Sequence, residues 1–306
     1  MLKIFGHKAP DTDATGSAII WAWALSDQGQ EAQPFVLGTP NTEAAFVLQR
    51  WGFETPDLLE TVTDTDEVVI VDTNNPAELP DNVSNAHIRQ IIDHHLLVGG
   101  ITTREPIEIT IKPLASTATI MAQMLDSEGR LDSAPEGIKG LILSCVLSDT
   151  LEFRSPTTTA YDQELAARLA KDLGVDINSY ASEMFAAKSD VSHMTDAELL
   201  RLDSKKYEVG GTNFRVSVLE TTSPAALIAR KTSLINSMPA VAQEDGVDQV
   251  LLFIVDILNE EATLLVANEM VASVAEKSFG QTPTGDSVVL PGVMSRKKQI
   301  IPNLKV

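Results

Sequence analysis

The sequence predicts an α/β fold, with a doubly wound, mostly parallel sheet domain followed by a smaller α/β domain with a mixed sheet. In the first half of the chain, short apolar runs alternate with segments whose apolar residues recur at helical spacing. This alternation is typical of βαβ units and a parallel sheet. Beyond about residue 200, strand-like runs follow one another closely, which indicates a second sheet of a different kind.

The predicted elements of the first part follow from periodicity. Residues 135–147 favour a helix, because Pro135 suits a helix start and positions 138, 141, 142, 145 and 146 are apolar. The remaining segments are strand-like runs at 2–5, 67–72 and 88–93, and helical patterns at 18–26, 42–51 and 116–128.

A domain boundary is predicted near 188–197, where the sequence is polar and has no apolar periodicity. We therefore expect a first domain over 1–188, a linker over 189–196 and a second domain over 197–306. The second domain is predicted to hold strands at 214–221, 249–257 and 262–268, and a helix at 225–238.

Composition excludes several classes of protein. Of the 306 residues 43% are apolar, yet no apolar run approaches the roughly 18 residues of a membrane span. A formal net charge of −20 argues against a nucleic-acid binder, which needs a basic face. The start shows no signal-peptide pattern, and the single cysteine, Cys145, fits an intracellular location. We expect a cytoplasmic protein that binds neither nucleic acid nor membrane.

Carboxylates and histidines gather in four short clusters far apart in sequence. At least three clusters follow directly on predicted strands, and ligand sites in parallel α/β sheets form beyond the carboxyl ends of the strands. The clusters should therefore converge on one edge of the sheet. Their candidate ligands are His7, Asp11, Asp13, Asp72, His94 and Asp149.

Each cluster taken alone has a simpler explanation. Asp11 and Asp13 could cap a helix, Asp72 could end a strand, and adjacent histidines often serve only as polar packing. Their joint occurrence favours a site, because three of the five histidines fall beside carboxylates. So many acids in one place raise one another's pKa, a conflict that two divalent metals about 3.5–4 Å apart, bridged by one carboxylate, would resolve.

The donor set also bears on the choice of metal and on the chemistry. Oxygen and imidazole ligands without thiolate suit Mn²⁺ or Co²⁺, admit Mg²⁺ and do not exclude Zn²⁺. Two ions that share a water would lower its pKa and supply a hydroxide nucleophile near neutral pH.

A basic cluster, SRKKQ at 295–299, stands out in so acidic a chain. It could be a solvated tail, or an anion clamp in which Arg296 binds a phosphate with two parallel hydrogen bonds and Lys297 adds a point charge. Lys205-Lys206 is a weaker candidate of the same kind.

The motifs GHKAPDTD (6–13), VDT (71–73), DHH (93–95) and SDT (148–150), in this order, resemble those of the DHH phosphoesterases. Together with SRKKQ and the spacing of all five, the set resembles the family II, manganese-dependent inorganic pyrophosphatases. The resemblance spans the chain from His7 to Gln299, and its strength lies in the ordered set rather than in any one motif.

The resemblance implies a role for each matching residue. His7 and Asp11 would bind one metal, Asp13, His94 and Asp149 the other, and Asp72 would bridge the two. His95 would lie beside the bridging oxygen of pyrophosphate and assist departure of phosphate, with Asp93 orienting the ligands. Among the acids and bases of the reaction we count His95, Asp149 and Asp93. Lys205, Arg296 and Lys297 would hold the substrate's phosphates.

The family also implies two Mn²⁺ ions (with Co²⁺ or Mg²⁺ possible), further Mg²⁺ or Mn²⁺ arriving with pyrophosphate, a homodimer, and an active site in the cleft between the two domains. Two departures stand out: Ala9 where the family commonly has Asn, and Thr73 where it commonly has His. Neither removes a predicted ligand, although the second could alter metal preference.

The predicted function is therefore hydrolysis of inorganic pyrophosphate to two phosphates by a metal-bridging hydroxide. One alternative keeps the fold and changes the substrate to short oligonucleotides or cyclic dinucleotides, which would need stacking surfaces that a chain with 5% aromatic residues scarcely offers. A second alternative is a protein that binds metal or phosphate without turnover.

Overall fold

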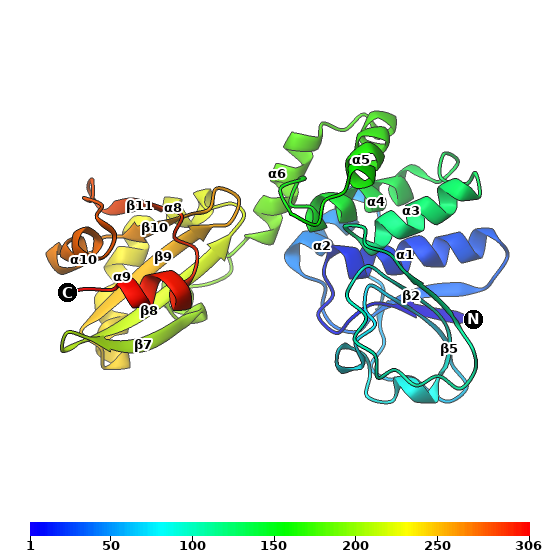
Figure 1. The fold of residues 1–306 in the computed structure, drawn as a ribbon, viewed down its shortest axis with the longest axis horizontal. Coiled ribbons are helices and arrows are strands. Elements are labelled where there is room, and N and C mark those ends of the chain that lie inside the picture. Colours follow the sequence, from blue (N-terminus) through cyan, green and yellow to red (C-terminus); the bar gives the residue numbers. More distant parts are fainter. The chain divides into compact units, whose positions relative to one another are not determined.

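The computed structural model describes residues 1–306, which divide into two compact units, Met1–Lys188 and Ser189–Val306 (Figure 1). Each unit is described by itself below. Residues 189–196, the predicted linker, are counted with the second unit. Helices in the structure are all too short or too polar to cross a membrane.

The first unit is built on a six-stranded sheet in which every pair of neighbouring strands is parallel. The strand order is β3-β2-β1-β4-β5-β6, so the predicted parallel sheet is confirmed. Its strands are β1 (Leu2–Phe5), β2 (Ala32–Val36), β3 (Asp57–Leu58), β4 (Glu67–Val71), β5 (His87–Asp93) and β6 (Glu108–Ile111).

The sheet reverses its direction of growth between β1 and β4. From β1 the chain adds β2 and β3 on one side, then returns to add β4, β5 and β6 on the other. Strands β1 and β4 lie next to each other, with Phe5 opposite Ile70. In doubly wound sheets, ligands bind at this reversal, beyond the carboxyl ends of the strands.

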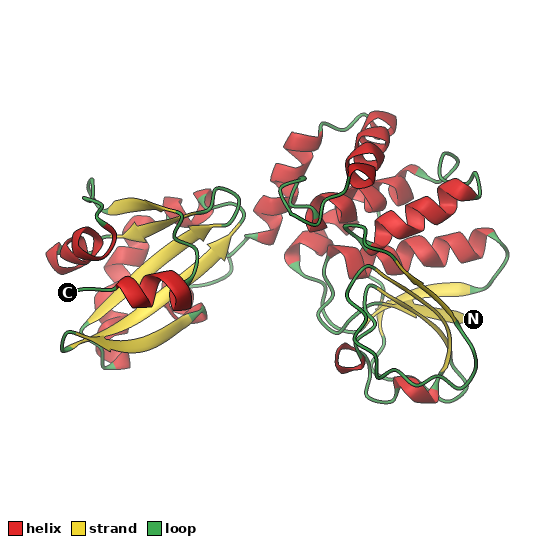
Figure 2. Ribbon diagram, in the orientation of Figure 1, coloured by secondary structure: helices red, strands yellow, loops and turns green.

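The helices of the first unit gather on one side of its sheet (Figure 2). On one face of the sheet, Phe5, Val68 and Ile70 form a buried cluster with Leu79 and Val83 from the connecting segments. The helices are α1 (Thr12–Asp27), α2 (Thr42–Trp51), α3 (Thr117–Ser127), α4 (Glu136–Asp149), α5 (Ala160–Leu173) and α6 (Ile177–Lys188), with 3-10 turns η1 (Pro76–Glu78) and η2 (Val83–Asn85).

Most predicted elements of this unit are present, including the helix expected over 135–147. The first helix begins six residues before the predicted 18–26, because the side chain of Asp11 accepts a hydrogen bond from the Ala14 N–H and caps it. Strand β2 was missed because it contains Pro34, which lies opposite Ile4 inside the sheet. Proline cannot donate to a ladder and usually argues against an interior strand.

The second unit holds a mixed five-stranded sheet in the order β11-β10-β9-β8-β7, which confirms the second half of the predicted fold. Only β8 and β9 are parallel neighbours. Its elements are α7 (Asp196–Leu202), β7 (Ser204–Val209), β8 (Thr212–Thr221), α8 (Ala225–Ala229), α9 (Lys231–Asp245), β9 (Gln249–Asp256), β10 (Glu261–Leu265), α10 (Glu269–Phe279), β11 (Ser287–Pro291), a π-helical turn η3 (Arg296–Ile300) and α11 (Ile301–Asn303).

Both faces of this sheet are covered. On one face, Phe214, Phe253 and Leu264 pack with Val274 of α10 and Ile300 of the π-helical turn. On the other, α7 and α9 supply a separate buried cluster. The single helix predicted over 225–238 is two helices that meet at Arg230, whose guanidinium donates to Asp196 and to the backbone oxygens of Val191 and Met194.

Candidate metal centre

The six predicted ligands come together at the carboxyl edge of the parallel sheet. His7 follows β1, Asp72 follows β4 and His94 follows β5, which are three adjacent strands. The other three are supplied by helices: Asp11 and Asp13 at the start of α1, and Asp149 at the end of α4. The structure thus places all six at the reversal point of the sheet.

One group consists of His7, Asp11 and Asp72, whose ligand atoms lie within 4.8 Å of one another. His7 Nε2 is 3.7 Å from Asp11 Oδ1 and 3.5 Å from Asp72 Oδ2. Asp11 also caps α1, so the capping role considered from the sequence is real. The capping bond and the contact with His7 involve the same oxygen, Asp11 Oδ1, and a carboxylate oxygen can accept more than one bond.

A second group consists of Asp13, His94 and Asp149, again with ligand atoms within 4.8 Å. His94 Nε2 lies 3.9 Å from Asp149 Oδ2 and 4.0 Å from Asp13 Oδ2. His94 Nδ1 is 3.2 Å from the carbonyl oxygen of Leu114. A carbonyl only accepts, so Nδ1 carries a proton, and Nε2, which faces the carboxylates, is the nitrogen that could bind a metal.

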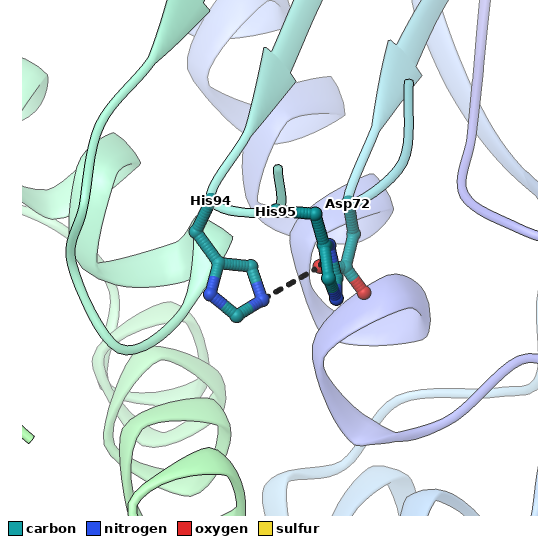
Figure 3. Close-up of side chains that lie close together, drawn as sticks. All are labelled: Asp72, His94 and His95. Carbon is teal, nitrogen blue, oxygen red and sulfur yellow. Dashed lines mark ion pairs between the residues drawn. The ribbon is translucent and has the colours of Figure 1, made fainter. Parts of the chain in front are cut away.

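Asp72 lies between the two groups. Its Oδ2 is 3.5 Å from His7 Nε2 and its Oδ1 is 3.4 Å from His94 Nε2, the contact drawn in Figure 3. The side chain is only 2% exposed. Its backbone has a φ of 59°, a left-handed conformation that is uncommon outside glycine and frequent at functional sites. Asp72 therefore has the geometry of a bridging carboxylate.

Asp72 and Asp149 are buried among other carboxylates, which raises their pKa values, and bound cations would offset the repulsion. Burial raises the pKa of Asp72 well above its usual range, and Asp13 and Asp11 add to the effect. The pKa of Asp149 is likewise raised well above its usual range, by burial and then by Asp13 and Asp72. Asp149 Oδ2 is buried and has no hydrogen-bond partner. Acids that resist ionisation and an orphaned buried oxygen both fit a pair of divalent cations.

His95 and Asp93 form a separate pair at the rim of this centre. The His95 ring is 54% exposed, and its Nδ1 lies 2.9 Å from Asp93 Oδ1, which also accepts from the His95 backbone N–H. Asp93 is fully buried; its burial would raise its pKa, but the bonds from His95 and Asn74 outweigh that and lower it. An ionised Asp93 therefore fixes the orientation of the His95 ring.

Asn74 holds this rim together and was not among the predicted site residues. Its side-chain amide donates to Asp93 Oδ2 and to the Leu96 carbonyl, and its Oδ1 accepts from the Val98 N–H at 2.7 Å. Its partners are the last residue of β5 and the segment that follows that strand. The role of Asn74 can be seen only in the folded structure, where these partners surround its side chain.

The two departures from the family pattern lie together beside the centre. Thr73 Oγ1 donates to Glu78 Oε2 at 2.7 Å, so the hydroxyl points to that carboxylate. Ala9 and Thr73 line a pocket of about 500 Å³ with His7, Glu78 and His95. This pocket therefore lies next to the proposed metal ligand His7.

The second unit brings the three predicted phosphate-binding residues into one pocket of about 480 Å³. Lys205 comes from β7, and Arg296 and Lys297 come from the π-helical turn. The guanidinium of Arg296 donates to the Asp203 backbone oxygen at 2.8 Å and to Asp203 Oδ1 at 2.7 Å. We call this surface the cation pocket. Lys206, the weaker candidate, bonds the Asp245 backbone oxygen instead.

A further residue missed from the sequence is Thr117, the first residue of α3. Its backbone N–H donates to Asp13 Oδ2 at 2.6 Å, and its hydroxyl donates to Asp72 Oδ1 at 3.1 Å. Threonine near a helix start is too common to draw attention. Only the folded chain shows that it contacts two predicted ligands.

Comparison with known proteins covers nearly the whole chain. The profile of the DHH family, N-terminal domain, matches residues 2–148, and that of the DHHA2 domain matches residues 182–306. Two relatives carry the name probable manganese-dependent inorganic pyrophosphatase. The one from Deinococcus radiodurans is 41% identical and covers 100% of this chain and 98% of its own, and the one from Lactobacillus acidophilus is 34% identical over 98% and 96%.

Among solved structures, that of a putative family II inorganic pyrophosphatase from Methanococcus jannaschii is similar to this chain. The two are 34% identical and superpose with a TM-score of 0.63, covering 99% of this chain and 98% of the other. The similarity thus extends over both units of the chain and is not confined to the metal-binding motifs.

Proposed function

This chain belongs to the family of manganese-dependent inorganic pyrophosphatases, and we propose how its own residues carry out the hydrolysis of pyrophosphate to two phosphates. The observation that carries the proposal is the carboxylate of Asp72, which turns one oxygen toward His7 and the other toward His94. Such a carboxylate suits a centre that holds two ions side by side.

The proposed ligand sets follow the two groups of side chains. His7, Asp11 and Asp72 would hold one Mn²⁺, and Asp72 would share the second with Asp13, His94 and Asp149. When bound, the two ions would neutralise substrate charge and lower the pKa of a bound water to about 7. The protein supplies the fixed tautomer of His94 and the buried carboxylates that these ions require.

His95 is proposed to assist the leaving phosphate. Since Asp93 accepts from Nδ1, the ring keeps its proton there and turns Nε2 away from Asp93. A proton held at Nε2 would then pass to the oxygen of the departing phosphate as its bond to phosphorus breaks. The exposure of the ring leaves it accessible to a substrate.

Asp149 is proposed to act twice, as a ligand and as the acceptor of a proton from the attacking water. Its Oδ2 is the buried oxygen without a hydrogen-bond partner, so this atom can accept a proton from a water beside it. Proton removal by a positioned carboxylate makes the water a better nucleophile.

The cation pocket is proposed to bind the phosphates of the substrate. Pyrophosphate carries several negative charges that repel a nucleophile, and in phosphoryl transfer the protein contributes chiefly positioning and charge stabilisation. Lys205, Arg296 and Lys297 supply three positive charges in a chain whose net charge is −20. Further Mg²⁺ or Mn²⁺ would arrive with the substrate. The cleft between the two domains stays a prediction.

A homodimer is part of the proposal. Strand β6 ends the parallel sheet with one unpaired edge, and its Ile109 is 55% exposed. Open strand edges readily pair with a second chain. Light scattering after size exclusion should give twice the mass of 33.0 kDa, and Ile109→Lys should reduce it to that of a monomer. An unchanged dimer in this variant would place the interface elsewhere.

A cytoplasmic location is also proposed. The only cysteine, Cys145, is a buried free thiol, so the fold requires no oxidising compartment for a disulfide. Fractionation of the native host, followed with an antibody against this chain, should recover the protein with cytoplasmic enzymes. Recovery in a secreted or envelope fraction would contradict the proposal.

A phosphate-release assay tests the reaction itself. Purified full-length protein with Mn²⁺ or Mg²⁺ should release two phosphates from each pyrophosphate. Short polyphosphate and a dinucleotide serve as competing substrates in the same assay. Preference for the dinucleotide would overturn the assignment, as would tight binding of pyrophosphate without any release of phosphate.

A further inference from the structure

The start of helix α3 is directed at the metal centre. Thr117, its first residue, is fully buried, and its backbone N–H and its hydroxyl go to different carboxylates. The N–H donates to Asp13 Oδ2 at 2.6 Å, and the Oγ1 hydroxyl donates to Asp72 Oδ1 at 3.1 Å. The next residue, Ala118, donates its N–H to Asp13 Oδ1 at 3.1 Å. One short segment thus contacts two of the proposed ligands.

The hydroxyl of Thr117 is not needed for the helix. The cap of α3 is Ser116, whose Oγ accepts the backbone N–H of Thr119 at 3.1 Å. The side chain of Thr117 is therefore free to serve another purpose. Because the Thr117 hydroxyl does not cap the helix, its hydrogen bond to Asp72 is the better explanation for its presence.

That contact bears on the orientation of the bridging carboxylate. Asp72 Oδ1 accepts the hydrogen bond from the Thr117 hydroxyl and is also the oxygen 3.4 Å from His94 Nε2. By holding Oδ1 on the side of His94, the bond leaves Oδ2 on the side of His7.

We propose that Thr117 is a positioning residue that orients Asp72 and Asp13 for metal binding. The proposal rests on the proposed function, because it takes the two carboxylates to be metal ligands. It assigns Thr117 no contact with substrate. Groups that orient metal ligands typically change metal affinity about 10- to 100-fold when they are removed.

Two substitutions separate this role from simple packing. Thr117→Val keeps the shape and removes the hydroxyl, while Thr117→Ser keeps the hydroxyl and removes a methyl group. Both keep the backbone N–H that donates to Asp13. Thr117→Ala provides a smaller side chain without the hydroxyl, should valine disturb the fold.

The measurement is the affinity of metal-stripped, full-length protein for Mn²⁺, followed by the electron paramagnetic resonance signal of free Mn²⁺. We expect the dissociation constant to rise about 10- to 100-fold in Thr117→Val and Thr117→Ala, and to stay near the wild-type value in Thr117→Ser. The metal-free variants should unfold at the same temperature as one another. Saturating Mn²⁺ should restore turnover to Thr117→Val.

Wild-type affinity in both hydroxyl-free variants would overturn the proposal. So would a loss in Thr117→Ser as large as that in Thr117→Val, because packing rather than the hydroxyl would then be responsible. Failure of the proposed function is seen separately, as wild-type protein that binds Mn²⁺ and releases no phosphate from pyrophosphate.

Discussion

The metal centre of the first unit is built from buried and half-buried carboxylates and histidines, whereas the cation pocket of the second unit combines two exposed lysines with the half-buried Arg296. In the first, backbone donors, a carbonyl oxygen and a hydroxyl hold Asp13, His94 and Asp72 in place. In the second, the one cation held by several bonds is Arg296, through Asp203. Metal coordination demands fixed geometry, while anion binding needs mainly charge within reach. The two regions should therefore respond differently to substitution.

The largest expected effect is the loss of turnover in Asp72→Asn. Removing the shared charge should release both ions and lower the rate of pyrophosphate hydrolysis on the order of 10³-fold, comparable to the loss of a key electrostatic group elsewhere. Metal content of the purified variant and its phosphate release are measured together. Asp132→Asn, an exposed carboxylate paired only with Arg168, is the matched control and should keep both. Normal metal content in Asp72→Asn would refute the bridging assignment.

A smaller loss is expected from the cation pocket. Arg296→Ala should lower kcat/KM for pyrophosphate about 10²-fold, because one phosphate loses its paired donors, while Mn²⁺ binding stays intact. Lys298→Ala removes a charge from the same π-helical turn at a side chain outside the pocket, and should change little. Steady-state kinetics measure kcat/KM of both variants, and a Mn²⁺ titration measures their metal binding. Equal effects of the two variants would mean that the turn acts through its overall charge.

The contact between Asp203 and Arg296 should matter less still. Asp203→Asn keeps the backbone oxygen that accepts from Arg296 and weakens only the ion pair, whose carboxylate is 56% exposed. Exposed pairs contribute up to about 1 kcal/mol, so KM for pyrophosphate should rise about two- to five-fold. Glu208→Gln, elsewhere on β7, is the control. A decrease in KM would show that Asp203 competes with the substrate for Arg296.

The smallest effect concerns stability in acid and belongs to the second unit. Burial would raise the pKa of Asp245, but Arg201 and Arg215 outweigh it and hold the value below the usual range. A carboxyl with a depressed folded pKa contributes stability above its unfolded value, about 3.9, and the contribution is lost as pH falls through the folded value. Wild type should lose up to about 1 kcal/mol in this way.

Calorimetric unfolding of the full chain at several pH values below 5 would test this. Asp245→Asn should be less stable than wild type near neutral pH, and the difference should shrink as the pH falls. Glu244→Gln, an exposed partner of Arg201, should show little of this dependence. A difference that grows in acid would contradict the sign worked out here.

Much of the metal centre could be predicted because its residues follow strand ends, and parallel strands end at one edge of a sheet. His7, Asp72 and His94 could be grouped on that basis alone. Strand β2 could not be predicted, since Pro34 breaks the usual rule for interior strands. Nor could the break between α8 and α9, which lies at Arg230, a residue whose side chain bonds residues more than thirty positions earlier in the chain.

The groups that orient the ligands could not be predicted from the sequence either, because they too act through contacts between residues far apart in the chain. Thr117 lies far along the chain from Asp72 and Asp13, and Leu114 lies 20 residues after His94, so their importance comes entirely from proximity in the folded chain. A hydroxyl or a carbonyl has no distinguishing pattern in sequence. Ligands are recognised by residue type, whereas the groups that orient them are recognised only by position.

The left-handed backbone at Asp72 limits which substitutions this position can accept. Among the twenty residues, only glycine, asparagine and aspartate adopt this conformation readily, and of these only aspartate brings a charge. Few other residues can therefore replace Asp72 without straining the backbone or losing its charge. Efforts to retune the enzyme for another metal should keep Asp72 and vary its neighbours, beginning with Thr73 and Ala9, which line the pocket beside it.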